Sequence, residues 1–299
     1  MVGRFAPSPS GRMHLGNVFA ALLAWLSVRS QNGEMVLRIE DLDPDRCRPE
    51  YIQQLREDLR WLGLDWDREQ TPQSRRTRDY DAAFSRLMEK NLLYPCYCSR
   101  AELHAASAPH ASDGRFVYPG TCRNLTADQR ERKEKTPAWR LAVPDENYTF
   151  TDGLQGVYGE NLQTDCGDFI LRRADGVYAY QLAVVWDDLT GGITQVVRGK
   201  DLMASTPRQL YLYKLLGGVP PEYYHVPLLV DDQGRRLSKR DRDLDLGELR
   251  KTHTAPQLLG KLAYAAGILP TCRPVTAKEL VGEFDWDKIR RENIPMAMV

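Results

Sequence analysis

Two polar segments near opposite ends of the chain combine residue types that suit chemistry on phosphate groups. The first covers residues 4–17 and reads RFAPSPSGRMHLGN. It lies between an apolar stretch and a helical pattern, so His14 is predicted at a helix N-terminus, where free N–H groups and the helix dipole favour phosphate. Gly16 would let a nucleotide lie against the backbone, because a Cβ there would obstruct it. Arg4, at the end of the preceding strand, can bind a carboxylate through two hydrogen bonds.

The second segment covers residues 235–240, reads RRLSKR and follows a turn at Gln233-Gly234. Lys239 is predicted to lie on a loop. A cationic side chain on a loop suits a reaction in which negative charge grows on a transferring phosphoryl group. Taken alone, each segment also has a simpler interpretation. Residues 235–240 could be a solvated basic loop, and the segment around His14 could be an ordinary strand-to-helix turn.

The elements around these segments alternate between strand and helix. Apolar runs at 2–6 and 35–40 predict strands, and helical spacing predicts helices at 15–30 and 51–62. Short connections between such units are typical of a parallel α/β sheet. A further β-α unit is predicted from Val196 onward, and helices are predicted at 256–267 and 278–284 in the C-terminal part.

The regular alternation is lost between residues 95 and 165, which contain a Pro/Ser/His-rich loop and a run of charges. We predict four parts on this basis. They are 1–94, the first half of a nucleotide-binding catalytic domain; 95–165, an insertion; 166–225, the second half of that domain; and 226–299, the lysine loop with a short helical region.

In this order and at this separation, the two polar segments resemble the paired signatures of class I aminoacyl-tRNA synthetases. Residues 14–17 resemble the "HIGH" element, with Asn17 in place of its second histidine. Residues 236–240 resemble "KMSKS", with arginine, leucine and arginine at three of its positions. The resemblance implies a Rossmann-like catalytic fold that binds ATP with Mg²⁺. The residues it implies for ATP are His14, Gly16, Asn17, Ser238 and Lys239, with His14 and Lys239 catalytic.

The sequences of residues 4–11, 37–41 and 197–202 are more specific than the two signatures, and they resemble the glutamyl branch of that class. In this branch the matching residues line the pocket for L-glutamate, and they are Arg4, Ala6, Ser8, Glu40, Tyr180 and Arg198. The chemistry agrees, because Glu40 can bind the ammonium group while Arg4 and Arg198 each pair with a carboxylate. Two arginines disfavour glutamine, whose neutral amide would leave buried guanidinium charge unpaired.

The region after Lys239 is short for a glutamyl-tRNA synthetase. About sixty residues follow it, so we expect no anticodon-binding domain. In length and in the 5–11 loop the chain resembles the glutamyl-queuosine tRNA(Asp) synthetases. This resemblance implies activation of glutamate without bound tRNA, and transfer to queuosine at the wobble position of tRNA(Asp), whose anticodon loop enters the site.

Cysteines cluster in the predicted insertion. Cys96 and Cys98 precede Cys122 by a long loop, and three thiolates with one more donor would form a closed, structural zinc site. The resembled family implies Tyr118 as the fourth ligand, while His104 and His110 remain alternatives, as do three reduced thiols without metal. The other cysteines are interpreted as packing residues, and they are Cys47, Cys166 and Cys272.

Composition narrows the class of protein. Lys plus Arg and Asp plus Glu are both 41, which disfavours indiscriminate binding to polyanions. No apolar run is long enough to span a bilayer and no secretory signal is evident, so we expect a cytoplasmic protein. Nothing in the sequence points beyond a monomer. Two alternatives stay open: a compact glutamyl-tRNA synthetase that charges a tRNA 3′ end, and a non-catalytic synthetase paralogue that binds RNA or protein.

Overall fold

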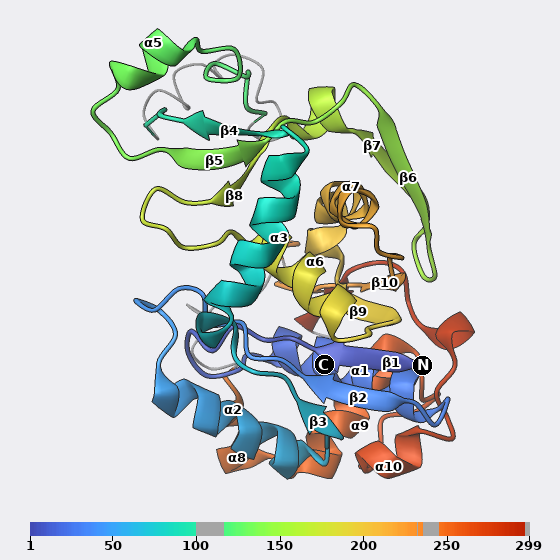
Figure 1. Ribbon diagram of the computed structural model, residues 1–299. Coiled ribbons are helices and arrows are strands. Elements are labelled where there is room, and N and C mark those ends of the chain that lie inside the picture. Colours follow the sequence, from blue (N-terminus) through green and yellow to red (C-terminus); the bar gives the residue numbers. More distant parts are fainter. Residues whose placement is uncertain (100–116, 232, 236–244, 297–299) are drawn as a thin grey trace.

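A five-stranded parallel sheet forms the centre of the molecule. The computed structural model describes residues 1–99, 117–231, 233–235 and 245–296 (Figure 1). Strand order in the sheet is β10-β9-β1-β2-β3, and every pair is parallel. The bounds are β1 (Val2–Phe5), β2 (Glu34–Leu37), β3 (Arg68–Glu69), β9 (Gln195–Gly199) and β10 (Glu222–Val226).

Helix α1 (Leu15–Arg29) packs on one face of this sheet. Eleven of its fifteen residues are buried, which fits a helix that is apolar nearly all round. Side chains of β2 alternate between the faces: Met35 and Leu37 join the core around α1, whereas Val36 joins a separate apolar cluster. Leu210 of α7 (Thr206–Leu216) packs against that second cluster, so the sheet is covered on both sides.

A smaller antiparallel sheet lies beyond the central one (Figure 1). It comprises β4 (Leu93–Cys96), β5 (Ala138–Leu141) and β8 (Phe169–Arg172), in that order. A hairpin of β6 (Asn147–Asp152) and β7 (Gly156–Asn161) follows β5. The predicted boundaries at 94/95 and 165/166 remain predictions. The first falls within β4, and β5 and β8 lie on opposite sides of the second.

The hairpin returns to the central sheet at its turn. The Gly153 N–H donates a hydrogen bond to the Tyr223 carbonyl at 2.8 Å. A Cβ on Gly153 would lie 2.2 Å from a ring carbon of Tyr224, so only glycine permits this approach. The end of β6 is therefore fixed beside β10.

Helix α2 (Pro49–Leu62) packs on α9 (Ala255–Ala266), and α6 (Tyr180–Thr190) packs on both α3 (Thr77–Glu89) and α7. At the other end, α8 (Leu246–Thr252), α9 and α10 (Ala277–Leu280) follow one another. The strands β11 (Leu229–Val230) and β12 (Ile294–Pro295) pair in parallel and tie the C-terminal part to the rest.

The α/β fold with a parallel sheet is confirmed. One predicted helix is too long, because 278–284 is helical only as far as Leu280. Thr276 caps the start of α10, but Gly282 stands two residues after its end and disfavours a further turn. No helix in the described ranges is both long and apolar enough to cross a membrane.

Candidate active site

The candidate site lies at the carboxyl edge of the central sheet. The chain order of the strands reverses between β1 and β9, and ligands of open α/β sheets bind in the crevice at such a switch point. Arg4 near the end of β1 and Arg198 near the end of β9 both line a cavity of about 410 Å³ there. Both side chains are buried.

The structure brings together the predicted residues that it describes. One cavity is lined by eight of them: Arg4, Ala6, Ser8, His14, Asn17, Glu40, Tyr180 and Arg198. Gly16 lines an adjoining cavity of about 140 Å³, which shares His14 and Asn17 with the first. The amino-acid and nucleotide predictions thus meet in one crevice. Ser238 and Lys239 lie outside the described residues.

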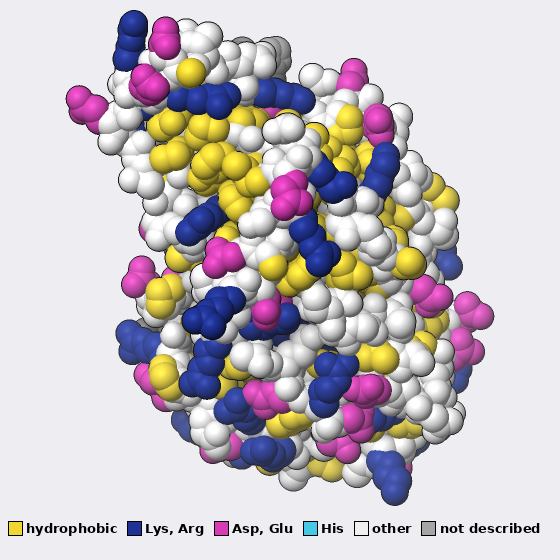
Figure 2. Space-filling model, in the orientation of Figure 1, with side chains coloured by type: hydrophobic (Ala, Val, Ile, Leu, Met, Phe, Trp, Pro, Cys, Tyr) yellow, Lys and Arg dark blue, Asp and Glu magenta, His cyan; other side chains and the backbone are white. Residues whose placement is uncertain are grey.

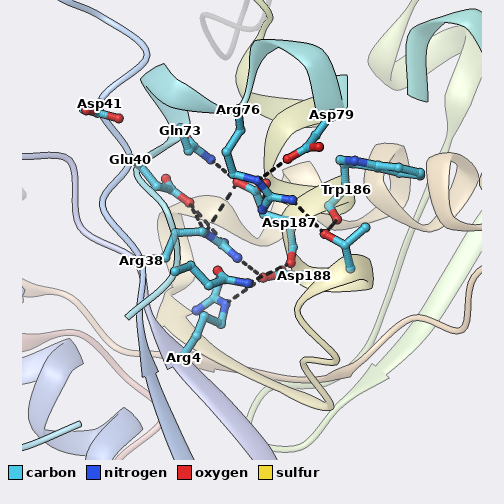
Figure 3. Close-up of polar contacts among 12 residues, drawn as sticks. Arg4, Arg38, Glu40, Asp41, Gln73, Arg76, Asp79, Trp186, Asp187 and Asp188 are labelled. Atoms are coloured by element: carbon cyan, nitrogen blue, oxygen red, sulfur yellow. Dashed lines mark hydrogen bonds and ion pairs between the residues drawn. The ribbon is translucent and has the colours of Figure 1, made fainter. Parts of the chain in front are cut away.

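A network of buried ion pairs holds Arg4 and Glu40 in place (Figure 3). Arg38 is fully buried, and its Nη1 donates to Asp188 Oδ1 at 2.5 Å while its Nη2 donates to Glu40 Oε1 at 3.1 Å. Arg4 Nε lies 3.5 Å from the same Asp188 oxygen. One aspartate of α6 therefore positions two arginines, and one of these positions Glu40.

Asp187 forms the base of this network (Figure 3). Its carboxylate accepts hydrogen bonds from Gln73 Nε2 at 2.7 Å, Arg76 Nη1 at 2.6 Å and the Tyr80 hydroxyl at 3.0 Å. Because each partner comes from the segment leading into α3 or from α3 itself, α6 and α3 are locked together beneath the crevice.

Burial makes the charged form of Glu40 costly, and an ammonium group beside it would offset that cost. Burial raises the pKa of its carboxyl above the ordinary value, against the opposing effect of Arg38 and Arg4. Its side chain is 9% exposed and lines the cavity. A cation placed beside it would favour the carboxylate form, so this position suits an α-amino group.

Tyr180 and Arg198 line the same cavity. Burial raises the pKa of the Tyr180 hydroxyl, although Arg198 lowers it, so the phenol remains protonated and can donate a hydrogen bond. The Arg198 Nη2 donates to Thr206 Oγ1 at 2.8 Å. Together with Arg4, these groups offer positive charge and donors to carboxylates.

The residues predicted to bind the nucleotide lie around the start of α1. His14 is the N-cap residue, and its backbone N–H donates to Asn17 Oδ1 at 3.3 Å. The Asn17 amide oxygen is therefore already engaged in a hydrogen bond within the protein. A Cβ on Gly16 would lie 3.1 Å from two ring atoms of His14, so this glycine leaves room for the imidazole, a role that the sequence did not suggest.

The three clustered cysteines come together as predicted. The thiol sulfurs of Cys96, Cys98 and Cys122 all lie within 4.8 Å of one another. The Tyr118 hydroxyl oxygen lies 3.4 Å from Cys96 Sγ and 3.6 Å from Cys98 Sγ. Ligands of a tetrahedral zinc ion at ~2.3 Å lie roughly 3.8 Å apart, so this donor set fits the ion. His104 and His110 lie outside the described residues.

Arg140 lies against this cluster. Its Nε donates to Cys96 Sγ at 3.2 Å, and its guanidinium carbon lies 3.7 Å from the centre of the Tyr118 ring. Burial raises the pKa of the Cys96 thiol, but hydrogen bonds from Tyr118 and Arg140 outweigh it and leave that pKa below its usual value. The buried cation therefore favours a thiolate, the form that binds metal.

Comparison with known proteins agrees with this geometry. Residues 1–279 match the family model "tRNA synthetases class I (E and Q), catalytic domain". A glutamyl-Q tRNA(Asp) synthetase from Nitratidesulfovibrio vulgaris is 51% identical over 94% of this chain and 90% of its own length. One from Symbiobacterium thermophilum is 47% identical, over 98% and 95%. The chain belongs to the glutamyl-Q tRNA(Asp) synthetase family of class I ligases.

A solved structure also resembles this family member. A glutamate tRNA ligase from Elizabethkingia meningosepticum, in complex with its amino acid, matches with a TM-score of 0.84 at 25% identity. The match covers 99% of this chain and 66% of that ligase.

Sequence reasoning missed the residues behind the pocket. Arg38 lies inside the string that carries Glu40, and Asp187 and Asp188 interrupt an otherwise apolar helical run. A buried pair of acids requires partners, which was the available signal. The prediction that Cys272 is a packing residue is wrong, since its side chain is exposed, whereas Cys166 is buried.

Proposed function

We propose that the chain uses ATP to activate L-glutamate and transfers the glutamyl group to queuosine at the wobble position of tRNA(Asp). The observation that supports this proposal most directly is that Arg4, Glu40 and Arg198 line one cavity together with the histidine at the start of α1. Two guanidinium groups and one carboxylate complement the two carboxylates and one ammonium of glutamate. The names of the relatives at 51% and 47% identity support the acceptor.

In the first step, the α-carboxylate of glutamate attacks the α-phosphorus of ATP, and pyrophosphate leaves. His14 at the helix N-terminus and Lys239 stabilise the charge that develops on the phosphates, and Mg²⁺ accompanies the nucleotide. Gly16, Asn17 and Ser238 complete the nucleotide contacts. In the second step, a hydroxyl of the queuosine cyclopentene ring attacks the mixed anhydride, AMP leaves, and the proton passes to its phosphate.

Surface charge fits selective rather than general binding of RNA. Over the lower half of the face in Figure 2, Lys and Arg side chains lie among Asp and Glu side chains. Such interspersed charge does not produce a continuous basic band for a polyanion. We propose that the acceptor is selected at the crevice, where the anticodon loop would enter.

The first test is exchange of labelled pyrophosphate into ATP in the absence of any tRNA. Exchange that requires glutamate, and that glutamine does not replace, is expected. Exchange that is absent from folded, metal-loaded protein would favour a non-catalytic paralogue. The matched variants are Arg4→Gln and Glu40→Gln, which remove one charge each; Glu40→Gln does so at nearly constant size.

The second test identifies the acceptor. Labelled glutamate should attach to tRNA(Asp) that contains queuosine and not to the same transcript with guanine at the wobble position. Label retained on the unmodified transcript would instead indicate a synthetase that charges the 3′ end. The likeness to a glutamate tRNA ligase makes this the relevant competitor.

We also propose that Cys96, Cys98, Cys122 and Tyr118 hold one structural zinc ion. Four protein ligands would leave no open position for substrate; the ion, when bound, would cross-link β4 to the segment that carries Tyr118 and Cys122. Metal analysis should give one zinc per chain, with weaker retention in Tyr118→Phe. Full retention in that variant would point to His104 or His110.

A further inference from the structure

A buried chain of hydrogen bonds ends on Arg198. His225 of β10 is the direct register partner of Arg198 in β9, so both side chains leave the sheet on the same side. Arg198 Nε donates to His225 Nε2 at 3.0 Å. On its other side, His225 Nδ1 lies 2.6 Å from Asp152 Oδ2. Both His225 and Asp152 are almost completely buried.

The geometry fixes the tautomer of His225. Arg198 Nε carries a single hydrogen and can only donate, so Nε2 of the imidazole must be the acceptor. The proton of a neutral imidazole then lies on Nδ1 and is donated to Asp152. Burial lowers the pKa of His225, against the hydrogen bond that it donates to Asp152, which raises it; the lowered pKa agrees with a neutral ring.

Asp152 is itself fixed by backbone groups. Its Oδ1 accepts N–H hydrogen bonds from Leu154 at 3.0 Å, Gln155 at 2.9 Å and His225 at 3.1 Å. It ends β6, in the hairpin that returns to the central sheet. The hairpin thus supplies a negative charge that is linked to the candidate glutamate pocket through His225 and Arg198.

Other contacts restrict the Arg198 guanidinium further. The Arg198 Nη2 donates to Thr206 Oγ1 at 2.8 Å. The central carbon of the Arg198 guanidinium lies 5.2 Å from the centre of the Tyr223 ring. The Tyr223 ring is stacked on His225 with an interplanar angle of 10°. With Nε and one Nη2 hydrogen engaged, the orientation of the fork is set before any ligand binds.

We propose that His225 is a positioning residue that, anchored by Asp152, aims the Arg198 guanidinium at a carboxylate of the amino-acid substrate. This rests on the proposed function, in which Arg198 binds glutamate. The imidazole supplies a neutral acceptor, so Arg198 keeps its full positive charge for the substrate. A carboxylate in the place of His225 would orient the arginine equally but would neutralise it.

The test compares His225→Asn with His225→Gln in the pyrophosphate exchange assay. Asparagine matches the reach of Nδ1 and keeps the contact with Asp152, whereas glutamine extends toward Nε2 and keeps an acceptor for Arg198. For His225→Asn we expect the KM for glutamate to rise about 10-fold or more, the effect of losing a hydrogen bond to a charged group. The KM for ATP should stay within about twofold, and His225→Gln should recover part of the loss.

A second matched pair changes Thr206, whose hydroxyl accepts from Arg198 Nη2 and also lies 3.4 Å from His225 Nε2, and it keeps the imidazole itself in place. Thr206→Val removes the hydroxyl acceptor at nearly constant shape, and Thr206→Ser retains it. Only the valine variant should raise the KM for glutamate. Nitrogen NMR of the unliganded protein should find His225 neutral with its proton on Nδ1.

The outcomes separate this inference from the function on which it rests. Wild-type protein that shows no glutamate-dependent exchange would overturn both. Active wild type with an unchanged glutamate KM in His225→Asn and Thr206→Val would overturn the positioning role alone. So would equal increases in the KM values for glutamate and ATP, or a proton found on Nε2.

Discussion

The amino-acid end of the crevice and the cysteine cluster balance buried charge in different ways. Around Glu40, each acid meets a guanidinium of the same chain, with Arg38 bridging Glu40 and Asp188. Around Cys96, the thiols and a phenol meet one cation among the described residues, Arg140. The pocket is organised by the chain alone, whereas the cluster can hold several thiolates only if a cation is added.

The largest effect is expected from Asp188→Ala, which removes the acid shared by Arg4 and Arg38. Breaking a buried ion pair leaves an uncompensated charge, so the free energy of unfolding should fall by about 3–5 kcal/mol. Urea denaturation measures it. The control is Asp175→Ala, whose exposed pair with Arg173 should contribute no more than about 1 kcal/mol. Similar losses in both variants would show that the network is not preorganised.

Removal of metal should affect the other region. A strong chelator should take zinc from about one per chain to none, and amide hydrogen exchange should then accelerate in β4 and β5. The strands β1 and β9 should keep their protection, because their charges are balanced within the chain. Cys96→Ser should reproduce this pattern and the exposed Cys272→Ser should not. Loss of protection throughout the central sheet would contradict the separation of the two regions.

The elements that the sequence predicted are those with a strong local pattern. The apolar spacing of 15–30 and the proline and glycine around 51–62 predicted α1 and α2 to within about a residue or two. The strings at 4–17, 37–41 and 197–202 contain most of the predicted residues that line the crevice, because each string is local. The hairpin of β6 and β7, within the predicted insertion, was missed.

The contacts behind the pocket could not be read from the sequence because they depend on register. His225 faces Arg198 only since β10 pairs with β9 in one register out of several. Asp152 lies 73 residues from His225 and reaches it through the hairpin turn. Arg140 is likewise 44 residues from Cys96. Sequence patterns indicate which residues do chemistry, and the tertiary structure shows which residues hold them.

Arg140 offers a sharper test of how the cluster is balanced. Arg140→Leu keeps all four proposed ligands but removes the donor to Cys96 and the cation over the Tyr118 ring. Losing such an outer contact should weaken zinc binding about 10- to 100-fold, as measured by competition with a chromogenic chelator. Arg140→Lys, which keeps the charge, should lose less. Equal affinity in all three proteins would mean that the ligands alone set the charge balance.

The smallest effect is a shift in the pH dependence of glutamate binding. Burial raises the pKa of Glu40. Arg38 and Arg4 lower it, Asp188 and Asp187 raise it further, and the pKa stays above its ordinary value. Binding of the ammonium group needs the carboxylate form, so affinity is full above this pKa and is lost as the pH falls through it. The loss should therefore begin at a higher pH than for an ordinary carboxyl of about 4.3.

Calorimetric titration of glutamate from neutral to mildly acid pH measures this loss, with the dissociation constant of ATP as the internal control, because the nucleotide does not need the Glu40 charge. In Glu40→Gln the affinity should be weaker throughout and should not vary over the same range. A wild-type affinity that stays constant until the substrate's own carboxylates titrate would show that Arg38 holds the Glu40 carboxyl ionised without help from the ligand. The pocket would then be still more completely balanced by its own charges than the contrast with the cysteine cluster implies.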